Sequence, residues 1–137
     1  MDKLSPERRS LNMSRIRAKN TSPELIVRRI VHSLGFRYRL HVPSLPGKPD
    51  LVFPRLKRII DVRGCFWHQH SLGCPDSRIP RSRLDYWQPK LKRNCERDVK
   101  NARQLRRCGW SILVVWECET RDLAKLAIRL IRFLNQK

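Results

Sequence analysis

Apolar residues recur with helical spacing in three stretches of the chain. The first stretch predicts a helix that starts at Ser22, with Ser22 as its cap, and that closes at Gly35. The second predicts a long helix between Pro89 and Gly109, and the third a final helix capped by Thr120. The apolar stripes expected on these helices are Val27, Ile30, Val31 and Leu34, then Leu91, Cys95, Val99, Ala102 and Leu105, then Leu123, Leu126, Ala127, Leu130 and Leu134.

Four shorter stretches have the pattern of strands. Apolar residues alternate with arginines over residues 36–40, which is typical of a half-buried strand. Residues 50–53 and 58–62 predict two short strands joined by a turn. The nearly continuous apolar run at 110–116 predicts a strand buried on both faces. Residues 64–82 have little periodicity and are expected to form an irregular excursion.

The order of these elements, α-β-β-β-α-β-α, predicts an α/β fold. Three strands would form an antiparallel meander, and a crossover helix would add the last strand in parallel, giving a mixed central sheet flanked by helices on both faces. A chain of 137 residues is long enough for one domain, which we expect over residues 21–137. Residues 1–20 are basic and only weakly apolar, which indicates either a disordered tail or an arm that orders against DNA.

The charge of the chain is strongly unbalanced, with 31 Lys and Arg against 12 Asp and Glu and a net charge of +19. Such a charge opposes compaction but attracts polyanions, and nucleic acid is the leading candidate. A basic packing protein of the ribosomal kind is the alternative. The sequence contains no apolar run of about 20 residues and no secretory leader pattern, so no membrane association is expected and the protein is expected to be soluble and cytoplasmic.

Two of the scarce acidic residues fall on neighbouring predicted strands. Asp50 opens one strand, and Asp61 interrupts the next apolar strand, where Val62 and Arg63 follow it. Hydrolysis of a phosphodiester needs oxygen ligands for Mg²⁺ and a cation near the phosphate. The two carboxylates and the Val62 carbonyl could supply the oxygens, and Arg63 the cation. The alternative is that Asp50 merely opens a strand and that Asp61 makes a salt bridge.

The excursion after these strands carries residues of metal-ligand type. Three of them have a spacing that a loop can fold around one Zn²⁺: Cys65, His70 and Cys74. Cys118 is the best candidate for a fourth ligand, because it follows a strand expected to lie beside the one ending at Val62. Cys95 and Cys108 fall in a helical pattern and are expected to be core thiols.

The same excursion contains His68 between two adjacent aromatic residues and the proposed ligand His70. His68 could act as the general base for the attacking water, or could be a packing residue. Phe66 and Trp67 are adjacent and cannot both point into one core, and Trp87 is a further aromatic outside the regular stripes. These rings could wedge between base steps and open a duplex, or they could cover the zinc loop.

Together these residues resemble the very short patch repair (Vsr) mismatch endonucleases. The resemblance extends from Asn12 to Glu119. Its most specific segments are LPGKPD (Leu45–Asp50), GCFWH (Gly64–His68), NCERD (Asn94–Asp98), and GW leading to VWEC (Val115–Cys118).

The resemblance implies a restriction-endonuclease-like core with a structural zinc and an activity that nicks DNA 5′ of the mispaired thymine at T:G mismatches, using Mg²⁺. Asp50 and the Val62 carbonyl would bind the metal, His68 would be the base, and Glu24 would orient a water at the metal. The zinc ligands implied are Cys65, His70, Cys74 and Cys118. The residues implied to insert beside the mismatch are Phe66, Trp67 and Trp87, with Met13 meeting them from the minor groove.

Two positions depart from the family pattern. Asp61 stands where the family often has an apolar residue, and Arg63 stands where a His or Asp is common. Both restore the general nuclease pattern of a second acid followed by a cation, so we expect Asp61 to be a direct metal ligand. The strictness of T:G specificity is the property that these changes could alter.

Two other functions are compatible with the sequence. One is a nuclease of the same fold without mismatch specificity, and the other is a zinc-stabilised DNA-binding module without catalysis. The partner expected in either nuclease is double-stranded DNA, with mismatch-repair proteins as possible further partners. A bacterial cytoplasmic monomer, nucleoid-associated when bound to DNA, is the expected state.

Overall fold

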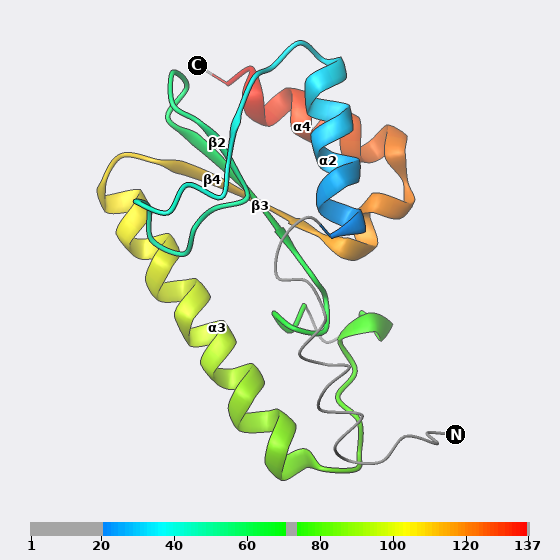
Figure 1. Ribbon diagram of the computed structural model, residues 1–137. Helices are drawn as coiled ribbons and strands as arrows, with labels where there is room; N and C mark the ends of the chain where they lie inside the picture. Colours follow the sequence, from blue (N-terminus) through cyan, green and yellow to red (C-terminus); the bar gives the residue numbers. More distant parts are fainter. Residues whose placement is uncertain (1–20, 71–73, 137) are drawn as a thin grey trace.

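The computed structural model describes residues 21–70 and 74–136. The predicted basic arm and Met13 lie outside the described residues. The main elements in chain order are α2 (Ser22–Ser33), β1 (Arg39–Leu40), β2 (Leu51–Phe53), β3 (Arg58–Arg63), α3 (Leu84–Arg107), β4 (Ser111–Trp116) and α4 (Leu123–Leu134) (Figure 1). Two short 3-10 helices, η1 (Pro75–Ser77) and η2 (Glu117–Arg121), complete the described part.

The four strands form one mixed sheet in the order β1-β2-β3-β4. β1, β2 and β3 are antiparallel neighbours, and β4 runs parallel to β3. Leu51 lies opposite Ile60, and Asp61 lies opposite Val114. This register confirms the predicted meander with one parallel strand added through the crossover helix α3.

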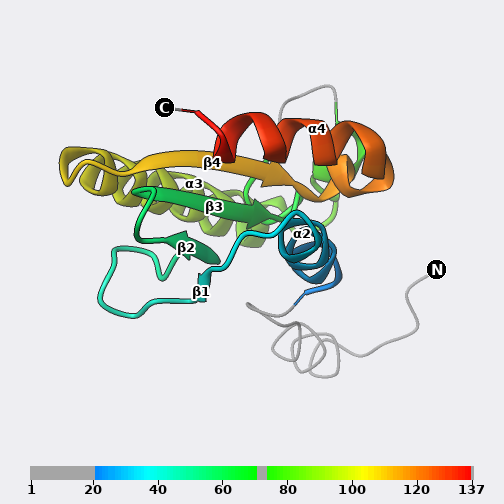
Figure 2. The ribbon, with the colours of Figure 1, turned by 90° about the horizontal axis from the view of Figure 1, so that it is seen from above.

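The sheet is covered on both faces, as predicted. Helices α2 and α4 cover one face of the sheet and α3 covers the other (Figure 2). Alternate strand residues point to opposite sides, so Leu51 and Ile60 belong to the core cluster with α2 and α4, whereas Val52 and Ile59 belong to the cluster with Leu105 of α3. The larger core cluster lies on the α2/α4 side and takes Val27, Val31, Leu126, Leu130, Phe133 and Leu134 from these helices. Burial of these apolar side chains is the main force that fixes α2, the helix carrying Glu24, against the sheet.

Several predicted boundaries are wrong by a few residues. The cap of α2 is Thr21, whose Oγ1 accepts a hydrogen bond from the Glu24 amide at 3.4 Å. The cap of α4 is Asp122, whose carboxylate accepts from the Lys125 amide at 3.2 Å, whereas the Thr120 hydroxyl donates to the Glu117 carbonyl. At each helix start a second residue able to cap lies within two positions of the first, Ser22 beside Thr21 and Thr120 near Asp122, so the sequence alone does not decide between them.

Helix α3 begins at Leu84, five residues before the predicted start at Pro89. Pro89 has no N–H to donate to the carbonyl of Asp85, four residues earlier in α3. This is tolerated because Asp85 lies in the exposed first turn of the helix. The predicted apolar stripe of α3 is only partly buried: Leu91 and Leu105 are buried, but Val99 is 56% exposed. Cys108 follows the last turn and is exposed, so its prediction as a core thiol is wrong.

Candidate functional site

The two predicted acidic residues lie side by side at one end of the sheet. Asp50 immediately precedes β2, and the antiparallel register brings it next to Asp61 in β3. Asp50 Oδ2 accepts a hydrogen bond from the Val62 amide at 2.7 Å, and Asp61 Oδ1 accepts one from the Asp50 amide at 3.4 Å. The antiparallel pairing of β2 and β3 therefore brings two carboxylates and the Val62 peptide group together.

Arg63 contacts Asp61, and this contact is compatible with both interpretations of the sequence: a cation beside a metal site, or a salt bridge to Asp61. Its guanidinium lies 3.8 Å from Asp61 Oδ2, so the salt bridge of the alternative interpretation is present. The same guanidinium lies 5.9 Å from the centre of the Trp116 ring. A cationic side chain is thus held next to Asp61.

Glu24 joins Asp50 from the first turn of α2, and a residue that the sequence analysis missed lies between them. Glu24 is 2% exposed and forms an ion pair with Arg28. His41 Nε2 lies 3.0 and 3.1 Å from the two Glu24 carboxylate oxygens and 3.8 Å from Asp50 Oδ1. Since β1 pairs Leu40 with Leu51, the residue after β1 must lie opposite Asp50, and this pairing is the signal that could have identified His41. We call Glu24, Asp50 and Asp61 the carboxylate cluster.

The electrostatics of the carboxylate cluster favour a bound cation. The pKa of Asp50 is raised to about 8, mainly by burial and further by the charges of Asp61 and Glu24, while the hydrogen bond from the Val62 amide opposes this rise. Burial also raises the pKa of Asp61, against the opposing effect of Arg63. Carboxylates crowded in a low-dielectric setting are stabilised in their charged form by a nearby cation. Hard oxygen donors of this kind fit Mg²⁺.

His68 has an oriented ring next to the carboxylate cluster. Its Nδ1 lies 2.6 Å from Asp98 Oδ2 on α3, and both residues lie close enough to Asp61 to influence its pKa. A carboxylate on Nδ1 fixes the tautomer and leaves Nε2 able to accept a proton. The sequence analysis noted Asp98 only as part of the NCERD motif. It gave no signal that α3 would bring Asp98 next to His68, which lies 30 residues earlier in the chain.

The four predicted zinc ligands come together, and we call Cys65, His70, Cys74 and Cys118 the thiol cluster. Their ligand atoms all lie within 4.8 Å of one another. His70 Nδ1 is 3.7 Å from Cys65 Sγ and 3.5 Å from Cys118 Sγ. Tetrahedral zinc places such atoms about 3.5–3.8 Å apart, so the arrangement fits a Cys₃His site.

Contacts around the thiol cluster hold it in place. The His70 ring stacks on Trp116 with centroids 4.2 Å apart, and the Cys65 amide donates to the Glu117 carboxylate at 3.3 Å. Burial raises the pKa of the Cys65 thiol to about 12, because it disfavours the thiolate in the absence of a cation. A metal that binds there would stabilise that thiolate.

The predicted wedge residues pack against one another. Ring centroids of Phe66 lie 5.1 Å from Trp67 and 5.2 Å from Trp87, with edge-on geometry. Trp87 is 6% exposed, whereas Phe66 and Trp67 are half-buried. The Trp67 carbonyl accepts a hydrogen bond from Asn94 on α3 at 3.1 Å. Insertion of these rings into DNA stays a prediction, as does the role of Met13.

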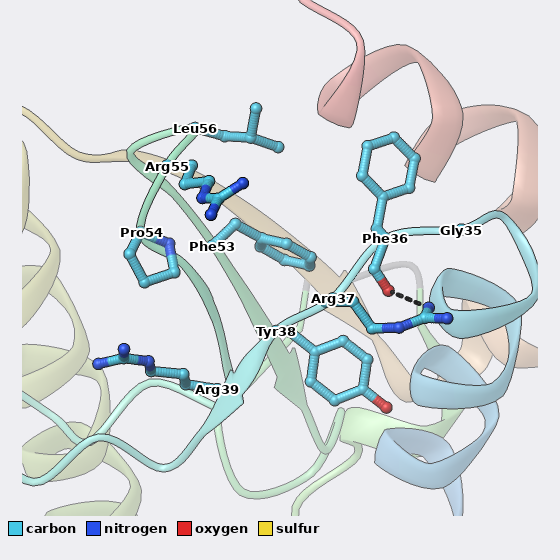
Figure 3. A pocket seen from close by; sticks show the side chains of 9 residues that line it. All are labelled: Gly35, Phe36, Arg37, Tyr38, Arg39, Phe53, Pro54, Arg55 and Leu56. Atoms are coloured by element: carbon cyan, nitrogen blue, oxygen red, sulfur yellow. Dashed lines mark hydrogen bonds between the residues drawn. The ribbon is translucent and has the colours of Figure 1, made fainter.

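A hollow of about 680 Å³ lies at the opposite end of β2, between the α2–β1 connection and the β2–β3 turn (Figure 3). Aromatic and apolar side chains line it, and arginines surround it. None of its lining residues is an acid, a histidine or a cysteine, so this hollow offers no side chain suited to metal binding or to acid–base catalysis. No helix in the described part of the chain is long and apolar enough to cross a membrane.

Comparison with known proteins identifies the family of this chain. The family model described as DNA mismatch endonuclease Vsr matches residues 1–74. The chain is 49% identical to the type II nicking enzyme V.XorIIP of Xanthomonas oryzae pv. oryzae, over 98% of this chain and 97% of the relative.

Two further relatives extend the comparison. The type II nicking enzyme V.NmeAIP of Neisseria meningitidis is 40% identical over 98% of this chain and 95% of its own length. The DNA mismatch endonuclease Vsr of Escherichia coli is 36% identical over 86% of this chain and 74% of its own length. The chain therefore belongs to the Vsr family of DNA endonucleases.

Proposed function

We propose that this endonuclease nicks duplex DNA 5′ of the mispaired thymine at T:G mismatches by Mg²⁺-dependent hydrolysis. The observation that carries the proposal is the convergence of Asp50, Asp61 and the Asp98-bound His68 at one end of the sheet. Hydrolysis needs a metal site, a base and a neighbouring cation, and this end of the molecule supplies all three.

Asp50, Asp61 and the Val62 carbonyl would hold the metal. A divalent ion bound there would neutralise charge on the phosphate and on the leaving oxygen. Asp61 is the departure from the family pattern, and its position beside Asp50 supports its role as a direct ligand. Arg63 would bind a non-bridging phosphate oxygen, in competition with its ion pair to Asp61.

His68 would take the proton of the attacking water at Nε2. Asp98 would stabilise the imidazolium that forms, which is the role of a carboxylate on Nδ1. Glu24 would position the water from the α2 side. The products would carry a 5′-phosphate and a 3′-hydroxyl.

Mismatch selection would depend on the aromatic side chains beside the base. A T:G step costs less to unstack than a matched step, so rings that wedge into the stack select it through deformation energy. Phe66 and Trp67 immediately precede His68, so a wedge and the base share one loop. Met13 and the basic arm, residues 1–20, would act from the minor groove. The thiol cluster would hold this loop through a structural Zn²⁺.

The test is a nicking assay on a labelled duplex with one T:G pair and on its T:A twin, in Mg²⁺ and in EDTA. We expect a Mg²⁺-dependent nick in the mismatched thymine strand alone, lost in Asp50→Ala. Equal nicking of both duplexes would refute mismatch specificity and leave a nicking enzyme of broader specificity. DNA binding without Mg²⁺-dependent nicking in any sequence context would refute the enzymatic proposal.

A further inference from the structure

We propose that Glu24, His41 and Asp50 form a second divalent-cation site, in which the imidazole of His41 is a direct ligand and which therefore favours Mn²⁺ over Mg²⁺. The proposal rests on the proposed function and deepens it, since Asp50 would be shared between this site and the one that includes Asp61. When the second site is occupied, Glu24 would bind its ion directly, and the water that Glu24 positions would be one bound to that ion. In this proposal His41, which lies next to Glu24, determines which metal ion the second site prefers.

The three side chains come from separate elements and converge on one point. Glu24 comes from the first turn of α2, His41 follows β1, and Asp50 precedes β2. One ligand atom from each lies within 4.8 Å of the other two. An octahedral ion with bonds of about 2.1 Å separates adjacent ligand atoms by about 3.0 Å and opposite ones by about 4.2 Å. The distances from His41 Nε2, 3.0 Å to Glu24 and 3.8 Å to Asp50, fall in this range.

A hydrogen bond explains only part of this arrangement. His41 Nε2 can donate its hydrogen to Glu24, but 3.8 Å is too long for a hydrogen bond to Asp50 Oδ1. Two carboxylates nevertheless face the same ring nitrogen, and the Asp50 and Glu24 side chains also hydrogen-bond to each other. A divalent cation would replace the proton shared by these carboxylates and bind all three side chains. The neutral ring can vacate Nε2 by carrying its hydrogen on Nδ1, so binding requires no net loss of a proton from His41.

The donor set determines the class of metal. Carboxylates with water suit Mg²⁺, Ca²⁺ and Mn²⁺, whereas an imidazole nitrogen favours transition metals. Mg²⁺ prefers a shell of oxygen ligands and water. The neighbouring Asp50–Asp61 pair offers only oxygen donors and keeps the preference for Mg²⁺. Arg28, ion-paired with Glu24, limits the affinity of the nitrogen-containing site without removing any of its three ligand atoms.

The test uses Mn²⁺ as the probe on the full chain with its thiol cluster loaded with zinc. Binding is followed by loss of the free Mn²⁺ signal in electron paramagnetic resonance, and ligation by ¹⁴N modulation in pulsed spectra of the bound ion. The variants are His41→Gln and His41→Asn, with His32→Gln as the matched control, since His32 is exposed at the far end of α2. His68→Gln tests the other nearby imidazole. Zinc content and circular dichroism establish that each variant is folded.

We expect ¹⁴N modulation in the wild type, in His32→Gln and in His68→Gln, and its loss in both His41 variants with Mn²⁺ affinity weakened about tenfold or more. Bound Mn²⁺ without ¹⁴N modulation would overturn the proposal, as would modulation that disappears only in His68→Gln, or no binding of Mn²⁺. These outcomes are independent of the proposed T:G nicking activity, which is measured separately with Mg²⁺ on the two duplexes.

Discussion

The thiol cluster and the carboxylate cluster are adjacent at the end of β3 and differ in chemistry. Asp61 is a residue of β3 (Arg58–Arg63), and Cys65 follows the end of this strand by two residues. The thiol cluster has four ligands, enough to complete a tetrahedral metal site. The carboxylate cluster offers oxygen donors and leaves coordination positions for water and phosphate.

The difference teaches how one segment can combine rigidity with reactivity. In this account the thiol cluster, once it binds metal, fixes the loop that carries Phe66, Trp67 and His68. The carboxylate cluster lies next to that loop at the end of the sheet. Asp98 on α3 joins the two regions by holding His68. Disrupting the thiol cluster should therefore affect both fold and activity, whereas disrupting the carboxylate cluster should affect activity alone.

The largest expected effect is that of Cys118→Ser. Loss of one thiolate from a structural zinc site should release the metal, lower the melting temperature by about 10 °C or more, and abolish nicking because His68 loses its support. Calorimetry and zinc analysis measure the effect. Cys108→Ser is the matched control, because Cys108 is exposed and lies outside the cluster. Unchanged zinc content and melting temperature in Cys118→Ser would refute the closed-site interpretation.

A smaller effect is expected for Asp98→Asn. The amide can still hydrogen-bond to His68 but lacks the charge that stabilises its protonated form, so single-turnover nicking should fall by about 10- to 100-fold. The melting temperature should change little. Glu96→Gln, an exposed acid on the same helix, should nick at the wild-type rate. Equal rates in the two variants would show that Asp98 does not act through His68.

The sequence was sufficient to predict the order of the elements and the members of the thiol cluster. Helical and strand periodicity predicted the elements, the local spacing of Cys65, His70 and Cys74 predicted three members, and the expected pairing of the last strand beside the one ending at Val62 predicted the fourth, Cys118. His41 and Asp98 were not predicted as site residues. Their partners lie 17 and 30 residues away, and only strand register and helix packing bring them together.

Trp67→Ala should reduce discrimination more than affinity. Phosphate contacts dominate affinity, so binding to matched DNA should change little, while the preference for the T:G duplex should fall by about tenfold. Trp67→Phe keeps an aromatic ring and should retain most of the preference. Binding titrations on the two duplexes at one salt concentration measure both quantities. An equal loss of binding to both duplexes would contradict the wedge.

The smallest expected effect is on stability as a function of pH. The pKa of Asp50 is about 8 in the folded protein and about 4 when unfolded, so the folded state holds an extra proton between these values and stability falls as pH rises through them. The charges of Asp61 and Glu24 contribute to the raised pKa of Asp50, and the Val62 amide opposes it. Between pH 7 and 8, Mg²⁺-free protein should lose about 1 kcal/mol more than Asp50→Asn in urea unfolding. Parallel pH profiles for the two proteins would contradict the raised pKa.

The central claim is that the carboxylate cluster performs the chemistry while the thiol cluster maintains the fold. It is tested most directly by measuring zinc content and Mg²⁺-dependent nicking of the T:G duplex on one preparation of Asp50→Asn. The account predicts one zinc per chain, as in the wild type, with nicking reduced by at least about a thousandfold, or about 4 kcal/mol in activation free energy. Wild-type nicking by zinc-loaded Asp50→Asn, or loss of zinc from it, would contradict that claim.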